Sequence, residues 1–242
     1  MADDLTSTNK KHFDALASDY DSRYEKTIAQ LVERVQARRA FIGADWVEDE
    51  DEDEGAKSVR FLDYACGTGM LSRALAPYTT QCVGIDLSEK MVASYNQRAE
   101  NQGLTPDEMH AYTGNLLDPS DPSPASLSSA HFHAFDVAAV GLGFHHFADP
   151  DLAARQLASR LRPGGVLFVV DFLPHEHHDV PAHAGVAHHG FSEERVRAIF
   201  EGAGVGKGFA LEEMGNGVVF HNVGGEGREM KRRVFIARGE KA

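Results

Sequence analysis

A glycine-containing turn between an expected strand and an expected helix carries the most chemical information in this chain. Residues 63–69 read Asp-Tyr-Ala-Cys-Gly-Thr-Gly. Glycine at 67 and 69 lets a ligand approach the backbone, and the start of a helix presents free amide groups. Asp86 follows nineteen residues after Gly67, at the end of the next expected strand, where a carboxylate can accept both hydrogen bonds of a ribose diol. The pattern predicts a nucleoside site.

Two details of this turn discriminate between nucleoside ligands. The third glycine of a dinucleotide fingerprint is replaced by Leu71 or Ser72, depending on the register. Asp63, at the end of the first strand, would repel a pyrophosphate but could orient a cationic amino acid group. The segment therefore favours a zwitterionic nucleoside that carries a sulfonium over NAD.

At this point the chain resembles the class I S-adenosylmethionine-dependent methyltransferases, and it is most similar to the small-molecule type, the methyltransferase 11/25 and ubiquinone/menaquinone-biosynthesis group. Besides the glycine turn, four segments match in order: the arm at residues 13–21, the Gly-Ile-Asp-Leu-Ser of 84–88, the Gly-Asn-Leu of 114–116 and the Leu-Arg-Pro-Gly-Gly of 161–165. The resemblance covers nearly all of residues 10–238.

The resemblance implies S-adenosyl-L-methionine as cofactor and S-adenosyl-L-homocysteine as product. It implies Asp86 on the ribose, Leu87 or Met91 against the adenine, and Asn115 where the family usually has an acid that accepts the adenine amino group; Asp118 is an alternative acceptor. The implied cofactor-binding residues are Tyr20, Asp63, Ala65, Cys66, Gly67, Thr68, Gly69, Asp86, Leu87, Met91, Asn115, Leu116 and Gly141.

Two histidine clusters are candidates for the acceptor side. His145 and His146 follow the fourth expected strand, and a neutral imidazole there could act as a general base; His145 is the candidate catalytic residue, and His146 is interpreted as structural. A second cluster lies within 174–190, which the resemblance implies is a lid over the acceptor. The spacing in that segment matches no closed zinc pattern, so no metal site is predicted, although a catalytic metal stays an alternative. The candidate substrate-binding residues are Tyr20, His145, His177, His178 and His183.

Alternating short apolar stretches and longer helical ones predict an α/β fold. Strands are expected at 59–64, 81–86, 109–114, 135–140, 165–172, 207–213 and 231–238. The resemblance implies a Rossmann-like, doubly wound sheet of seven mostly parallel strands in the order 3-2-1-4-5-7-6, the last antiparallel, with helices on both faces. Three regions are expected: a helical arm at 1–47, an acidic disordered linker at 48–57, and the main domain at 58–242.

Composition narrows the function classes. The chain has 242 residues and a formal net charge of −13, which opposes binding to nucleic acids or anionic membranes. It has two cysteines, and its start lacks the apolar core of a secretory signal, so a cytoplasmic location is expected. Nothing in the sequence indicates an oligomeric state or the identity of the methyl acceptor.

The function predicted from these observations is methyl transfer to a small-molecule acceptor by in-line displacement. The alternatives are a noncatalytic S-adenosylmethionine-binding regulatory protein, a metal-assisted methyltransferase that uses the histidine-rich loop, and a dinucleotide oxidoreductase.

Overall fold

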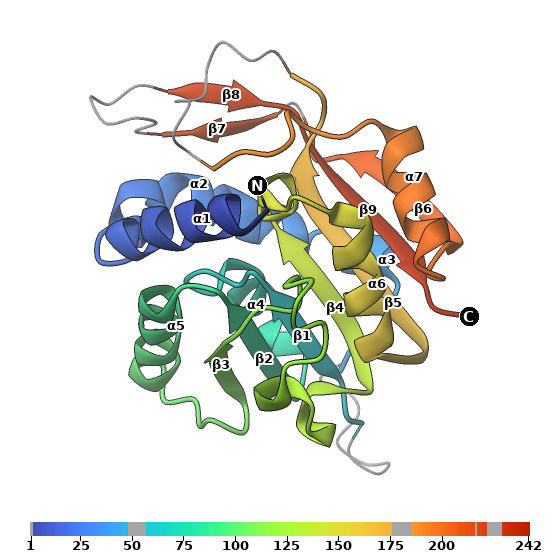
Figure 1. Ribbon diagram of the computed structural model, residues 1–242, viewed down its shortest axis with the longest axis horizontal. Helices are drawn as coiled ribbons and strands as arrows, with labels where there is room; N and C mark the ends of the chain where they lie inside the picture. The colour runs from blue at the N-terminus through green and yellow to red at the C-terminus, as the bar shows by residue number, and fades with distance from the viewer. Residues whose placement is uncertain (1, 48–56, 176–184, 216, 222–228) are drawn as a thin grey trace.

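The computed structural model describes residues 2–47, 57–175, 185–215, 217–221 and 229–242. Seven strands form one sheet in the order β3-β2-β1-β4-β5-β9-β6, in which β9 is antiparallel to both of its neighbours. The predicted strand order is therefore confirmed, with β9 as the seventh strand of the sheet (Figure 1). The sheet strands are β1 (Arg60–Tyr64), β2 (Gln81–Asp86), β3 (Met109–Thr113), β4 (Phe135–Gly141), β5 (Leu161–Phe172), β6 (Lys207–Glu213) and β9 (Val234–Glu240).

Two hydrophobic clusters cover the two faces of the sheet, as the two-residue period of buried parallel strands requires. Phe61 packs on one face with α2, α4 and α5, whereas the next residue, Leu62, packs on the other with α6 and α7. The helices are α1 (Ala2–Leu16), α2 (Tyr20–Gln36), α3 (Arg39–Ile42), α4 (Met70–Leu75), α5 (Glu89–Asn101), α6 (Pro150–Arg160) and α7 (Glu193–Gly202). In the part of the chain that is described, no helix combines the length and apolarity needed to cross a membrane.

The N-terminal helices pack directly on the sheet domain. Leu31 and Val35 of α2 belong to the same core cluster as Phe61 of β1. Figure 1 shows α1 and α2 along one end of the sheet. The division at 47 stays a prediction, and the acidic run of 48–54 lies outside the described residues.

A two-stranded hairpin, β7 (Val218–Phe220) and β8 (Met230–Arg232), was not expected from the sequence. The single strand predicted at 231–238 is divided, since β8 pairs with β7 whereas β9 joins the main sheet. The hairpin lies against α2 (Figure 1), where the Thr27 hydroxyl donates a hydrogen bond of 3.0 Å to the carbonyl of Val219.

Gly69, at the start of α4, has a positive φ of 89° and faces a buried ring. A Cβ atom there would lie 2.8 Å from two atoms of the Tyr95 ring. The Tyr95 ring is fully buried and its hydroxyl donates to Ser72 Oγ at 2.8 Å, so the ring cannot move away from an added Cβ atom.

We expect Gly69→Ala to lower the free energy of unfolding by about 2–4 kcal/mol, because backbone strain and overlap with Tyr95 add. Gly204→Ala is the matched control, since Gly204 has a φ of 75° but nothing within 4 Å of its Cβ position. For Gly204→Ala we expect only the cost of backbone strain, roughly 1 kcal/mol. Equal losses in urea denaturation would contradict the packing role of Gly69.

Candidate active site

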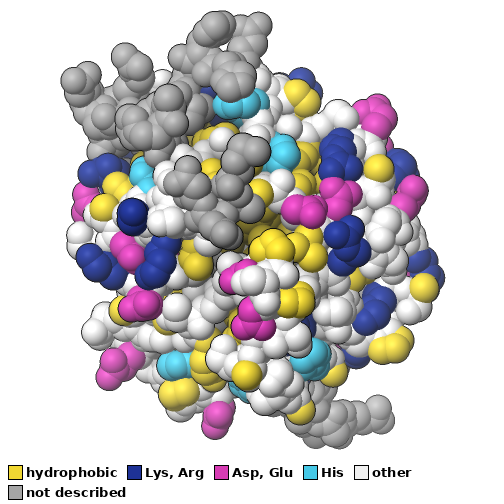
Figure 2. All heavy atoms as spheres, in the orientation of Figure 1, with side chains coloured by type: hydrophobic (Ala, Val, Ile, Leu, Met, Phe, Trp, Pro, Cys, Tyr) yellow, Lys and Arg dark blue, Asp and Glu magenta, His cyan; other side chains and the backbone are white. Residues whose placement is uncertain are grey.

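A cavity of about 720 Å³ opens at the carboxyl edge of the sheet, where β1, β2 and β4 end. It is lined by the β1–α4 loop, the end of β2, the segment after β4, and α1 and α2. Hydrophobic side chains gather near the carboxyl end of β4 at the centre of the face seen in Figure 2. Parallel strands with this order place their following loops together at such an edge. Eleven of the predicted site residues line this cavity: Tyr20, Ala65, Cys66, Gly67, Thr68, Asp86, Leu87, Met91, Asn115, Gly141 and His145.

The two glycines of the turn, Gly67 and Gly69, have different roles. Gly67 has a φ of 53°, and a Cβ atom added there would meet nothing within 4 Å, so the open space beside it belongs to the cavity. Gly69 does not line the cavity; it accommodates Tyr95. Ala65 also has a positive φ, 54°, which is uncommon for a residue with a side chain.

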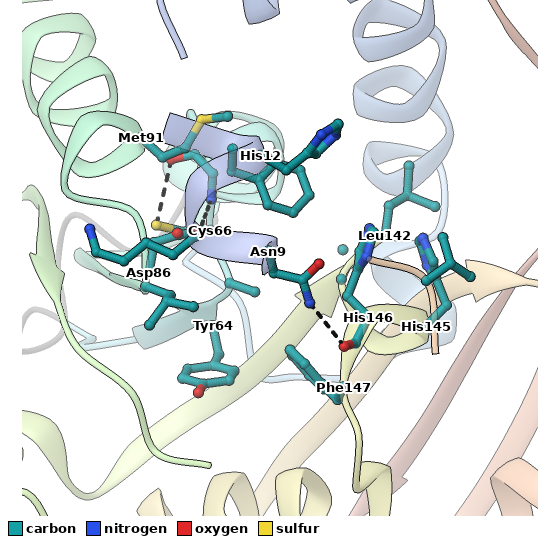
Figure 3. Close-up of a pocket in the computed structure, with 18 of the residues that line it drawn as sticks. Asn9, His12, Tyr64, Cys66, Asp86, Met91, Leu142, His145, His146 and Phe147 are labelled. Carbon is teal, nitrogen blue, oxygen red and sulfur yellow. Dashed lines mark hydrogen bonds between the residues drawn. The ribbon is translucent and has the colours of Figure 1, made fainter. Parts of the chain in front are cut away.

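Asp86 joins this turn to the end of β2. Its Oδ2 accepts a 2.8 Å hydrogen bond from the Gly67 amide, and its Oδ1 accepts one of the same length from Ser88. Burial raises the pKa of this carboxyl above its ordinary value. Each oxygen keeps acceptor capacity for a hydroxyl, and Leu87 and Met91 provide apolar walls beside it (Figure 3 labels Asp86 and Met91).

Asp63 lies elsewhere than the resemblance implied. It is 1% exposed, does not line the cavity, and accepts hydrogen bonds from the amide and hydroxyl of Ser72 at 3.0 and 2.7 Å. Burial raises the pKa of Asp63 to about 7. The interpretation that its side chain orients a cofactor amino group is corrected accordingly: in this structure the carboxyl holds the first turn of α4.

The predicted adenine contacts are divided between the cavity and the core. Leu116 is fully buried among core side chains and does not line the cavity, whereas the next residue, Leu117, does. Asn115 lines it, with Oδ1 accepting from the Leu117 amide at 2.9 Å and from the Tyr64 hydroxyl at 3.4 Å. Asp118, the alternative acceptor, also lines the cavity.

Polar contacts anchor the arm beside the turn. Thr68 Oγ1 donates to Asp21 Oδ1 on α2 at 2.5 Å, and Asp21 forms an ion pair with Arg98 of α5. Ser88 Oγ donates to Asp14 Oδ1 on α1, also at 2.5 Å. These contacts hold α1 and the start of α2 beside the glycine turn and Asp86.

Cys66 lines the cavity but is only 6% exposed, and burial raises the pKa of its thiol well above the ordinary value. A neutral thiol is a poor nucleophile. The side chain acts as part of the wall of the cavity.

His145 and His146 lie side by side, with ring centroids 4.2 Å apart (Figure 3). His145 Nδ1 lies 2.8 Å from Asp171 Oδ1, and Asp171 is fully buried at the end of β5. Burial, together with the neighbouring His145, lowers the pKa of His146 to about 3, so its imidazole is neutral. His146 Nδ1 pairs with the Gly185 carbonyl at 3.0 Å, which fits the structural role predicted for it.

Several cavity residues were not anticipated. Asp171, which does not line the cavity but pairs with His145, had a signal in the sequence, an acid near the end of a strand at the same edge as Asp86. The others, such as Asn9, which donates to the His146 carbonyl (Figure 3), come from segments distant in the chain and had none. The further lining residues used below are Ile28, Leu31, Leu142, Phe172, His175, Phe220 and Met230.

The segment 174–190, which was predicted to be a lid, is described only at 174–175 and 185–190. His175 donates its backbone amide to the His189 carbonyl at 3.1 Å, and His175 and Val186 line the cavity. His177, His178 and His183 lie outside the described residues. Among the residues that are described, no group of three His, Cys, Asp or Glu side chains is placed to hold a metal ion.

The raised pKa of Asp63 predicts a specific pH dependence. A carboxyl whose pKa rises from 3.8 unfolded to about 7 folded keeps its proton longer in the native state, so its contribution to stability falls as pH rises between those values. The slope is about 1.4 kcal/mol per pH unit. Asp63→Asn should therefore gain stability relative to wild type across this range in urea denaturation. A constant difference between the two proteins would show that Asp63 has no such shift.

Comparison with known proteins agrees with the geometry. Residues 62–167 match a family model described as a methyltransferase domain. An uncharacterized methyltransferase of Schizosaccharomyces pombe is 35% identical over 152 residues, 59% of this chain and 51% of the relative. A ubiquinone biosynthesis O-methyltransferase of Aromatoleum aromaticum is 30% identical over 124 residues, 51% of this chain and 47% of the relative. The chain thus spans about half the length of the curated relatives it matches.

Among solved structures, a putative methyltransferase of Haloferax volcanii, in complex with the Trm112 methyltransferase activator, superposes with a TM-score of 0.66 at 18% identity over 96% of both chains. The YcgJ protein of Bacillus subtilis superposes with a TM-score of 0.55, at 18% identity over 78% of this chain and 94% of that one. At such identities the likeness concerns the fold. The family model, the curated relatives and the solved structures named above are thus all methyltransferases, and this chain is similar to them in sequence over its central part and in fold.

Proposed function

We propose that this protein transfers a methyl group from S-adenosylmethionine to a small-molecule acceptor. The observation that carries the proposal is one cavity with two chemically distinct ends. Asp86 and Met91 lie on one side of the cavity, and His145 and His146 lie on the other (Figure 3). A cofactor and an acceptor bound in these two ends would share an enclosed space.

The residues of the first end fit the cofactor. Asp86 would accept the ribose hydroxyls, Leu87 and Met91 would contact the adenine, and the open space at Gly67 would admit the cofactor next to the backbone. Asn115 and Asp118 would lie near the adenine amino group, and Tyr20 near the sulfonium. When bound, the cofactor supplies an activated methyl group on a good leaving group.

The protein then has to align the acceptor with that methyl group and keep water away. The arm is placed for the second task, since Phe13 and Leu16 of α1 line the cavity opposite the strand ends. Water exclusion by α1 is consistent with the anchoring of Asp14 and Asp21 on the sheet domain.

A small molecule is the acceptor that these dimensions favour. A cavity of about 720 Å³ shared with the cofactor leaves room for one compact molecule. The net charge of −13 disfavours nucleic acid. Several curated relatives are named ubiquinone biosynthesis O-methyltransferases, which supports the same choice.

An acceptor screen that measures S-adenosylhomocysteine formation, with mass spectrometry of the product, tests this function. Binding of the cofactor without any transfer would favour the noncatalytic regulatory protein. Thermal stabilisation by NAD(P) and none by S-adenosylmethionine would favour the oxidoreductase.

Asp86→Ala should weaken S-adenosylmethionine binding by about 1.5–3 kcal/mol, because a charged acceptor of the ribose hydroxyls is removed. Calorimetry measures the effect. Glu100→Gln, an exposed change on α5 away from the cavity, is the control and should leave the affinity unchanged. An unaltered affinity in Asp86→Ala would remove the assignment of the ribose site.

Replacing His177, His178 and His183 together by Ala should lower turnover while the cofactor affinity changes less than about threefold, or ~0.7 kcal/mol, because a lid contacts the acceptor and excludes water. His110→Ala, on β3 outside the cavity lining, is the control for loss of an imidazole. Elemental analysis of the untagged protein tests the metal-assisted alternative. Stoichiometric metal that is lost together with activity on chelation would replace the lid by a metal site.

A further inference from the structure

The end of the cavity that the cofactor would leave free contains an oriented imidazole. Asp171 accepts three hydrogen bonds: from the backbone amide of His145 at 3.1 Å, from that of Phe172 at 2.7 Å, and from His145 Nδ1 at 2.8 Å. Because the carboxylate accepts at Nδ1, the proton of the neutral imidazole lies on Nδ1 and the lone pair lies on Nε2. The ring therefore presents a proton acceptor at its other nitrogen.

The walls around this imidazole are apolar and aromatic. The Phe172 ring lies 4.9 Å from the His145 ring and 5.3 Å from the Phe220 ring. Phe220 pairs with Met230 across the β7–β8 hairpin, and Ile28 lines the same cavity from α2. These surfaces match a flat apolar body.

From this arrangement we infer that the acceptor is a hydroxylated aromatic compound, that His145 is the general base for its hydroxyl, and that Asp171 is the positioning residue for His145. The inference rests on the proposed function. The acceptor oxygen forms a bond to the methyl carbon while the carbon–sulfur bond breaks, and the electron pair of that bond stays on sulfur. The hydroxyl proton goes to Nε2 of His145, and the imidazolium is stabilised by Asp171.

A base is needed most for a hydroxyl. A phenol, with a pKa near 10, is almost wholly protonated at neutral pH, whereas a thiol, with a pKa near 8.5, is already partly ionised. An aromatic amine attacks through its lone pair before it loses a proton, so it gains less from a base than a phenol does. The His145–Asp171 pair thus favours an oxygen acceptor.

Matched probes test the acceptor class. Para-butylphenol, para-butylaniline and para-butylthiophenol share one apolar body and differ in the reacting atom. We expect methyl transfer to the phenol in a reaction that depends on His145, measured as S-adenosylhomocysteine and as methylated product; any transfer to the thiophenol, which ionises readily without a base, should not depend on His145. Transfer only to the amine or the thiol, or to none of the three while the cofactor binds, would overturn the inference. Failure of the cofactor to bind in calorimetry would instead remove the proposed function itself.

Variants test the base and its positioning residue. His145→Gln should lower kcat for para-butylphenol by about 100-fold or more, and Asp171→Asn by about tenfold or more. Both should have a much smaller effect with para-nitrophenol, which is already ionised at mildly alkaline pH and needs no base. Should Asp171→Asn prevent folding, because the side chain is buried, His145→Gln provides the same comparison alone.

The comparison of the two phenols distinguishes a catalytic role of His145 from a structural one. His146→Gln is the matched control, since it alters the adjacent imidazole, whose Nδ1 contacts a carbonyl, and should change the rates with both phenols by the same factor. A loss in His145→Gln that is equally large with para-nitrophenol would show a structural role for His145 and overturn the inference.

Discussion

The carboxylate of Asp86 is the contact on which the cavity depends. Its two oxygens accept from Gly67 on the β1–α4 loop and from Ser88 at the start of α5, so two loops that follow neighbouring strands are held at one separation. Such charge-assisted hydrogen bonds are stronger than neutral ones. They also preorganise the carboxylate, because the backbone fixes its plane before any ligand arrives. The ribose position proposed here follows from that restraint.

Two further buried carboxyl groups, those of Asp63 and Asp171, lie near the same edge of the sheet, and they have different hydrogen-bond partners. Both are buried, but Asp171 accepts from three donors and contacts His145, which lines the cavity, whereas Asp63 accepts from Ser72 of α4. A buried carboxyl without such donors would be costly. Each of these acids therefore has defined hydrogen-bond partners. The partners determine whether the carboxyl group orients a residue of the cavity or stabilises the start of a helix.

The arm completes the site through contacts between distant segments. Asp14 bonds to Ser88 and Asp21 pairs with Arg98, so α1 and the start of α2 are attached to α5. Thr27 on the same helix α2 binds the β7–β8 hairpin. The proposed cofactor and acceptor ends of the cavity are thus both contacted by one continuous segment, α1 and α2, which is consistent with the proposed exclusion of water.

The sequence by itself determined the α/β class, the strand order through its resemblance to a family, and the cofactor turn, because these depend on local periodicity and on glycine and acid at fixed spacing. Only the tertiary structure decided which acids face the cavity. Asp63 is the penultimate residue of β1 and Asp86 is the last residue of β2; side-chain direction alternates along a strand, so the two carboxyl groups meet different neighbours, Ser72 and Gly67. The pairing of His145 with Asp171 and the meeting of Ile28 with Phe220 at one cavity likewise required the fold, since no local pattern specifies contacts between residues so far apart in the chain.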